Sequence, residues 1–213
     1  NNMFSIGKGN IVYSGDFDSE NWEIDLQLND IKGRVDTLDY ILNGPIHLSG
    51  VNSKQIFART SNFIIDIASY APMTISGGIC KNNEIINSNE NIYISSDGIT
   101  CEIRILYYKA LDDYEVGANI YFNEFNSPIK IKNLTDYELD GEIKFKLKKT
   151  DNFISTNGSV VLDRILVSPK IQVFDLLSDF TISLNNNQLN NLDFILRADS
   201  LQIGTNSFNN SQI

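Results

Sequence analysis

The chain has 213 residues, a formal net charge of −10 at pH 7 and a sequence pI near 4.5. This acidity argues against nucleic acid as a partner, because no basic stripe exists to neutralise phosphates, and against charge-driven binding to an anionic membrane surface. No run of about 18 apolar residues is present to span a bilayer. The start, Asn1–Phe4, lacks the basic region and apolar core of a signal peptide, and we expect the chain to be an excised piece of a longer one.

Apolar and polar residues alternate from one end of the chain to the other. Trp22, Ile24, Leu26 and Leu28 alternate with polar residues, and Leu38–Leu48 continues the pattern with an apolar residue or glycine at every second position. Successive side chains of a β-strand point to opposite faces, so each such segment has one apolar and one polar face. Helical periodicity is almost absent, and the sequence therefore predicts an all-β fold.

The predicted elements begin with Phe4–Phe17, a glycine-interrupted strand or hairpin with a bend at Ser14–Gly15, followed by a turn at Asp18–Asn21. The strands expected in the first half are Trp22–Asp30, Leu38–Leu48, Lys54–Thr60, Asn62–Ser69, Met73–Ile79, Asn91–Ser95, Ile99–Lys109 and Glu115–Asn123. Those expected in the second half are Pro128–Lys132, Tyr137–Lys149, Ile154–Leu162, Lys170–Phe174, Phe180–Leu184 and Leu192–Ala198, with a helical turn at Val173–Asp179.

Strand length indicates the architecture. Leu38–Leu48, Ile99–Lys109 and Tyr137–Lys149 each exceed the five or six residues of an average strand, and at about 3.3 Å per residue each would extend roughly 35–43 Å. We predict a long, curved, mainly antiparallel or mixed sheet, folded into an elongated trough with an apolar concave face. The alternative is a β-sandwich, in which the apolar faces of two sheets meet as a core. No linker composition divides the chain, so residues 1–213 are expected to form a single β-rich domain.

A glycine followed by an alternating apolar strand recurs at irregular spacing, in Gly7–Gly15, Leu42–Gly50, Leu139–Phe145 and Asn157–Leu162. Together with Asp25–Ile31, these segments resemble the AsmA/TamB group of bacterial envelope proteins. The resemblance implies an elongated, curved sheet that belongs to an inner-membrane-anchored protein of the periplasm, with the anchor outside this segment. It also implies a role in lipid transport between the membranes or in outer-membrane protein assembly (a translocation and assembly module), with phospholipid acyl chains and an outer-membrane assembly barrel protein as partners.

On this hypothesis the function is carried by the apolar face and involves no catalysis and no cofactor. The residues expected to line the lipid groove are Ile24, Leu26, Leu28, Ile46, Leu48, Ile103, Ile105, Ile143, Phe145 and Leu147. The alternatives are a cell-surface adhesin or carbohydrate-binding β-domain and, third, the structural repeat of a fibre.

No enzyme active site is predicted. His47, the one histidine, falls on the polar side of its strand beside Pro45 and Ser49, so a catalytic triad has no other base to use. The acidic segment Asp16–Asn21 lacks the glycine and the distant glutamate of a calcium loop and is expected to be a solvated turn, as is Asp112–Asp113.

The remaining candidate positions are also given structural interpretations. Cys80 is expected on a polar face and Cys101 on an apolar one, which favours two free thiols over a disulfide, and the cysteines and histidine show no metal-ligand spacing. The acceptor motifs at Asn133 and Asn157 are incidental in a bacterial protein, and Tyr107–Tyr108 are expected to pack in the sheet, with sugar stacking as the alternative.

Overall fold

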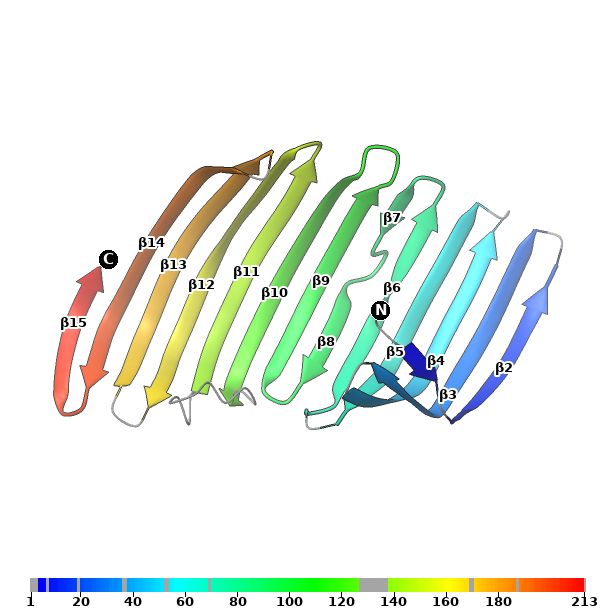
Figure 1. Cartoon of the computed structure of the whole chain (residues 1–213), viewed down its shortest axis with the longest axis horizontal. Coiled ribbons are helices and arrows are strands. Elements are labelled where there is room, and N and C mark those ends of the chain that lie inside the picture. The colour runs from blue at the N-terminus through cyan, green and yellow to red at the C-terminus, as the bar shows by residue number, and fades with distance from the viewer. Residues whose placement is uncertain are drawn as a thin grey trace. The chain divides into compact units, whose positions relative to one another are not determined.

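The computed structural model describes residues 4–6, 8–18, 20–35, 38–51, 54–68, 70–126, 138–168, 171–186 and 188–212. The chain divides into two compact units: unit 1 comprises Asn1–Asp97 and Glu102–Ala110, and unit 2 comprises Gly98–Cys101 and Leu111–Ile213. Every regular element in the described ranges is a β-strand and none is a helix (Figure 1). The prediction of an all-β fold is confirmed.

Unit 1 is one antiparallel sheet. Its strands are β1 (Phe4–Ile6), β2 (Asn10–Phe17), β3 (Asn21–Val35), β4 (Leu38–Val51), β5 (Gln55–Ile67), β6 (Met73–Asn82), β7 (Ile85–Asn87), β8 (Ile92–Ser96) and, from Glu102 onward, β9 (Ile99–Tyr108). They lie in the order β1–β3–β4–β5–β6–β7–β9, while β2 pairs with β3 and β8 with β6 and β9. Neighbours in sequence are therefore mostly neighbours in the sheet.

Unit 2 is also an antiparallel sheet, with its strands in sequence order. They are β10 (Asp113–Asn126), β11 (Glu138–Thr150), β12 (Phe153–Ser168), β13 (Ile171–Asn185), β14 (Gln188–Ile203) and β15 (Asn206–Gln212). Most are far longer than the average strand of five or six residues, as the alternation predicts.

In unit 1, a bulge in one strand lies opposite a glycine in the next strand. Leu28 of β3 lies opposite Gly44 of β4 while Ile31 lies opposite Leu42, so β3 carries one extra residue here. Gly44 itself has φ +123°, and a Cβ on it would collide with the carbonyl oxygen of Asn62 in β5. Only glycine combines this backbone conformation with so close an approach.

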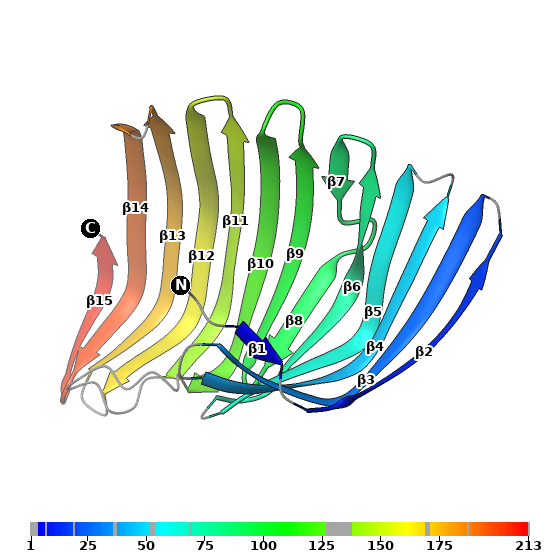
Figure 2. The ribbon, with the colours of Figure 1, turned by 45° about the vertical axis from the view of Figure 1, so that its right-hand side comes forward.

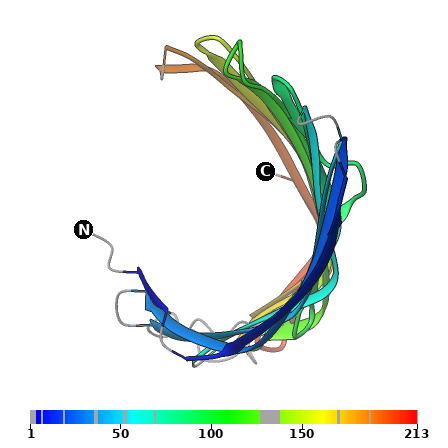
Figure 3. The same ribbon diagram turned by 90° about the vertical axis from the view of Figure 1, so that its right-hand side faces the viewer.

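The same device recurs along the chain. In β5, the register against β6 shifts between Thr60 and Phe63, beside Gly77 with φ +117°. In unit 2, Gly141 of β11 has φ +131° and lies opposite Leu162, where β12 carries an extra residue, Asp163. A bulge bends a strand and increases its twist. The strands are visibly bent in both units, most clearly β2 and β3 of unit 1 and the lower part of β14 in unit 2 (Figures 2 and 3).

Each bulge also changes which alternate positions face the apolar side. In β3 the apolar face is formed by Ile24, Leu26 and Leu28 before the bulge and by Ile31 after it. The extra residue thus keeps the apolar side chains on one face, although their numbering changes from even to odd. Strand β4 keeps one phase of alternation along its whole length and has no extra residue. Its Gly44 lies at the bulge of β3 and lets the backbone of the neighbouring strand approach closely.

Three predictions about the strands are wrong, because the alternation changes phase inside a strand as well as at the end of one. The segments predicted as Lys54–Thr60 and Asn62–Ser69 are one strand, β5, interrupted only by its bulge. Lys170–Phe174 and Phe180–Leu184 are likewise both part of β13, and no helical turn exists at Val173–Asp179; Asp175, with φ 49°, adopts an irregular conformation there.

Near the N-terminus the expected bend at Ser14–Gly15 is also absent. Strand β2 continues through both residues, with Ser14 opposite Asp25 and Gly15 opposite Ile24, and the break lies instead between β1 and β2. Strands β7 and β15 were not predicted, and the expected strand Pro128–Lys132 lies outside the described residues.

Neither unit has a closed core in the residues described. Within each unit the strands form a single sheet, and no large side chain of the described ranges is fully buried. The only buried hydrophobic residues among them are Ile31, Tyr40, Cys80, Ala118 and Leu162. A sandwich would bury one face of each sheet, so the β-sandwich alternative does not describe either unit.

The bulge–glycine pairs generate a prediction about stability. Replacing Gly141 with Ala forces a side chain into a left-handed backbone conformation and against the backbone of Val161, and should lower the free energy of unfolding by about 1–3 kcal/mol. Gly117, on the neighbouring strand β10, has open space at its Cβ position. Gly117→Ala is therefore the matched control and should be neutral or slightly stabilising. Denaturant unfolding measures both variants, and equal effects would contradict the assigned role of Gly141.

Candidate functional site

One face of unit 1 is apolar across several strands. The register places Ile24 opposite Leu48 and Leu26 opposite Ile46, and β4 and β5 continue this face through Leu48 and Ala58. Exposure alternates along β3, where the apolar residues are half-buried and the intervening Glu23, Asp25 and Gln27 are exposed. Apolar side chains therefore shelter one another along the rows of the sheet, although no second layer of described residues in this unit covers them.

The other predicted lining residues of unit 1 belong to the same face. Leu28 lies opposite Gly44 in β4. In β7, Ile86 lies opposite Lys81 of β6 on one side and opposite Tyr107 of β9 on the other, so the three side chains share a face. Ile79 is two residues from Lys81 in β6 and therefore projects to that face as well. Ile103 and Ile105 alternate with Tyr107 in β9, so they project to the face that carries Ile79.

An apolar hollow of about 200 Å³ lies on this face of unit 1. It is located where the bulge of β5 meets Gly77 of β6, and its aliphatic and aromatic lining comes from β4, β5, β6 and β8: Ile46, Ala58, Phe63, Ile75, Ile79 and Ile92. Of these, only Ile46 was predicted as a lining residue. An apolar cavity of about 150 Å³ remains dry and holds a benzene-sized molecule, so this hollow suits a short stretch of hydrocarbon.

Unit 2 presents an apolar face of the same kind. Ile143, Phe145 and Leu147 of β11 lie opposite Ile120, Ala118 and Val116 of β10. In the other direction the face continues through Val160 of β12 and Phe180 and Phe194, which lie opposite each other on β13 and β14. Toward β14 this face is open to solvent, since Leu192 is 57% and Phe194 56% exposed. The three predicted residues of this unit thus share one apolar surface, and their role in lipid binding stays a prediction.

The opposite face of unit 1 carries a polar hollow of about 830 Å³. Asp25, His47 and Arg59 form a row across β3, β4 and β5, because Asp25 lies opposite His47 and His47 opposite Arg59. His47 Nδ1 is 2.7 Å from Asp25 Oδ1, with the histidine side chain 20% and the aspartate 68% exposed. The rest of the lining is Pro45, Thr60, Ser61, Ser76, Gly77, Glu90, Asn91 and Tyr93.

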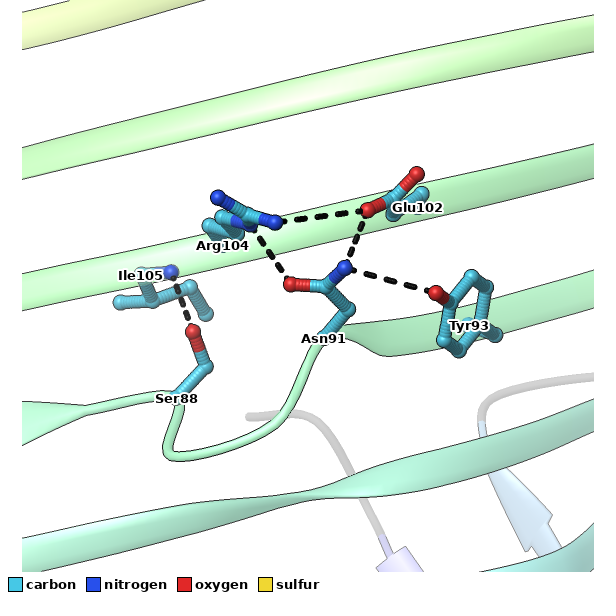
Figure 4. A network of polar contacts seen from close by, with 6 residues as sticks. All are labelled: Ser88, Asn91, Tyr93, Glu102, Arg104 and Ile105. Atoms are coloured by element: carbon cyan, nitrogen blue, oxygen red, sulfur yellow. Dashed lines mark hydrogen bonds and ion pairs between the residues drawn. The ribbon is translucent and has the colours of Figure 1, made fainter.

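Asn91 organises one wall of the polar hollow. Its side-chain amide donates to Glu102 and, at 3.4 Å, to the hydroxyl of Tyr93, while its carbonyl oxygen accepts a 2.6 Å hydrogen bond from Arg104 Nε (Figure 4). Arg104 also lies 4.0 Å from Glu102. The segment between β7 and β8 is further held by Ser88, whose hydroxyl accepts from the backbone N–H of Ile105 at 3.1 Å. The network gives this wall a fixed side-chain arrangement.

The sequence located His47 on the polar face correctly but did not reveal its partner. Asp25 is 22 positions away, and only the register of β3 against β4 brings the two together. No serine or cysteine is hydrogen-bonded to His47 in the part of the chain that the structure describes, so the pair lacks the nucleophile of a triad.

The other chemical candidates have structural roles. Cys80, buried on the polar face opposite Phe57, and Cys101, half-buried, are both free thiols, and burial raises the pKa of the Cys101 thiol, which lowers its reactivity. In Asp16–Asn21, Asp18 accepts hydrogen bonds from the backbone amides of Glu20 and Asn21. Asp112 forms an ion pair with Lys149. The described ranges contain no cluster of three or more His, Cys, Asp or Glu side chains that could hold a metal ion.

Asn157 and the tyrosine pair can also be placed. Asn157 lies on β12 opposite Lys146 and Thr181, on the polar face, whereas the motif at Asn133 falls outside the described residues. Tyr107 is half-buried and Tyr108 is 40% exposed.

Comparisons with protein-family models, with curated proteins and with solved structures find no match for this chain. Among the described residues, no helix has the length and apolar character needed to cross a membrane.

In the His47–Asp25 pair the carboxylate is largely exposed while the His47 side chain is only 20% exposed, and solvent at the carboxylate limits the contribution of the pair to stability. We expect His47→Ala to change the free energy of unfolding by less than about 1 kcal/mol, because water screens the exposed carboxylate of Asp25. Denaturant unfolding at pH 7 measures this difference, with Arg34→Ala, which removes the exposed pair with Asp39, as a comparison. A loss of several kcal/mol in His47→Ala alone would show that the pair is a structural anchor.

Asp18 gives unit 1 a pH-dependent turn. The hydrogen bonds from the backbone N–H groups of Asn21 and Glu20 lower the pKa of Asp18 below its ordinary value. A carboxylate whose pKa is lowered on folding stabilises the native state above its unfolded pKa, and this contribution is lost as the pH falls through the folded pKa. Asp18→Ala should thus be less stable than the wild type at pH 7, with the difference vanishing in strong acid. A difference independent of pH would contradict this origin.

Proposed function

We propose that this chain is a non-enzymatic segment of an envelope protein, in which the apolar face of each unit serves as a groove for the acyl chains of phospholipids. The observation that carries this proposal is that each unit has a face that is apolar from strand to strand, without a second layer of described residues over it. Contiguous exposed apolar surface in a protein marks an interaction site. Hydrocarbon is the occupant that fits a surface with so few polar atoms.

The free energy of burying an acyl chain favours a conduit over a tight binding pocket. Burial of a methylene group gains about 0.8 kcal/mol, so a 16-carbon tail gains on the order of 12 kcal/mol as an upper bound. Most of this gain is already available to the tail in a bilayer. A groove therefore keeps the environment of the tail nearly constant while it crosses water, which lowers the barrier to transfer without trapping the lipid.

The cellular setting of the proposal follows from the resemblance of Leu42–Gly50, Leu139–Phe145 and related segments to the AsmA/TamB group. The chain would act in the periplasm as part of a protein anchored in the inner membrane outside this segment. Lipid would move between the inner and outer membranes, and an outer-membrane assembly barrel protein would be the partner in any role in outer-membrane protein assembly.

Photo-crosslinking tests the apolar face with internal controls. A photoreactive residue at Leu26 or Phe145, on the apolar faces, should capture lipid in living cells. The same probe at the adjacent Gln27 or Lys144, whose side chains project to the opposite faces, should not. The adducts are identified by mass spectrometry. Equal capture from both faces, or none from either, would contradict the groove.

A charge on the apolar face tests transport itself. Ile143→Asp places a carboxylate in the path of the tails, a solvation barrier of about a few kcal/mol, and should block lipid transfer in cells. Because no described residues of unit 2 cover this face, the variant should still fold, as circular dichroism would show. Asn157→Asp adds the same charge to the exposed polar face of the same unit and should leave transfer intact. Normal transfer in a folded Ile143→Asp variant would overturn the proposal.

A further inference from the structure

Arg59 supplies a cation to the lining of the polar hollow of unit 1. It lies opposite His47, whose Nδ1 is already engaged with Asp25. In the ranges that the structure describes, no hydrogen bond or ion pair engages the guanidinium of Arg59. A guanidinium presents a planar set of donors that matches a carboxylate in a bidentate fashion.

Other residues of the lining offer a flat aromatic ring and polar side chains. Tyr93 is 43% exposed, and its hydroxyl is held by Asn91, which is held in turn by Glu102 and Arg104 (Figure 4). A tyrosine ring presents an apolar face with a polar tip. Because the tip is tethered, the ring is preorganised to receive a flat ligand face, which reduces the cost of ordering it on binding.

Hydroxyl and carboxylate groups complete the lining. Ser61 and Ser76 supply hydroxyls that both donate and accept hydrogen bonds, and Glu90 supplies a carboxylate that accepts them. Glu90, like Arg59, has no hydrogen-bond or ion-pair partner among the residues described. A ligand for this hollow therefore needs an anionic group for Arg59, hydroxyl groups for Glu90 and the serines, and a flat apolar face for Tyr93.

We propose that the polar hollow of unit 1 binds an acidic sugar, a pyranose ring that carries a carboxylate. The carboxylate pairs with Arg59, hydroxyls of the ring bond Glu90, Ser61 and Ser76, and the apolar face of the ring stacks on Tyr93. The hollow, at about 830 Å³, lies within the range of small-molecule sites and accommodates a ring with its substituents. Most of its side chains project from the face opposite the apolar one, although Arg59, Thr60, Ser76 and Gly77 also border the apolar hollow.

The net negative charge of the chain means that an anionic ligand is recognised only by short-range contacts within the hollow. With a net charge of −10, the protein does not attract an anion from a distance. Arg59 must therefore act at contact distance, beside an Asp25 carboxylate that His47 Nδ1 already engages at 2.7 Å.

Nuclear magnetic resonance titration of the full chain tests the proposal with two sugars. Sodium glucuronate carries the carboxylate and glucose lacks it. Glucuronate should shift the signals of Arg59, Tyr93 and Ser76 in a saturable way, and glucose should bind at least about tenfold more weakly, because a charge-assisted hydrogen bond is lost. Arg59→Ala should weaken glucuronate binding by at least about tenfold, with a smaller loss in Arg59→Lys, which keeps the charge without the fork. Tyr93→Ala should weaken the binding of both sugars.

The control is Arg34→Ala, which removes an exposed arginine of the same unit whose partner is Asp39, and it should bind glucuronate like the wild type. Arg59 is exposed, so its variants are expected to fold, and their spectra report this directly. Absence of saturable shifts with glucuronate up to about 50 mM, a range that detects millimolar dissociation constants, would overturn the proposal. Equal binding of glucose and glucuronate, or unchanged binding in Arg59→Ala, would also overturn it. None of these outcomes bears on the lipid groove, which Phe145 and Lys144 test independently.

Discussion

The structure depends on the pairing of a bulge in one strand with a glycine in the next. A long strand that follows the twist of its sheet must bend, and the bulge permits the bend at the cost of one extra residue. That residue would turn the apolar face into the polar one for the remainder of the strand. The sequence compensates by changing the phase of its alternation at the same point, as between Leu28 and Ile31 or between Leu162 and Ile165. Glycines such as Gly44 and Gly141 then let the neighbouring backbone approach.

A single-layer sheet has consequences for stability. Without a second layer of described residues in either unit, stability comes from the hydrogen-bond ladder and from rows of half-buried apolar side chains on adjacent strands. Only a few described residues, such as Ile31 and Leu162, are buried. Such a sheet retains apolar surface that a sandwich would use as core. The same property that limits burial leaves a surface free for a ligand.

The bulges also shape the two hollows of unit 1. Arg59, Thr60, Ser76 and Gly77 contribute to both, because the irregular backbone of β5 and β6 leaves space on each side of the sheet. Side-chain alternation then separates the chemistry: Phe63 and Ile75 line the apolar hollow, whereas His47 and Tyr93 line the polar one. Two binding surfaces of opposite character thus share one stretch of backbone.

The sequence by itself determined the strand content, the two faces and the side of each strand on which His47, Cys80 and Ile143 lie. These properties follow from a period of two residues, which is local and visible in one segment at a time. The phase changes in β5 and β13 are visible in the sequence too, but a change of phase looks the same whether a strand ends or continues past an irregularity, so the pattern predicts an end. Only the tertiary structure decided whether the strand ends or continues, because this depends on whether the neighbouring strand continues its hydrogen bonds past the irregularity.

The candidate sites show the same division. Alternation predicted that Leu26, Ile46 and Phe145 belong to apolar faces, but the apolar hollow is mostly lined by residues such as Phe63 and Ile92, which the bulge brings together. The pairing of Asp25 with His47, and the position of Arg59 beside them, depend on the registers of β3, β4 and β5. Register is set by contacts between segments far apart in the chain, so the sequence specified the composition of each face and the tertiary structure specified which side chains meet on it.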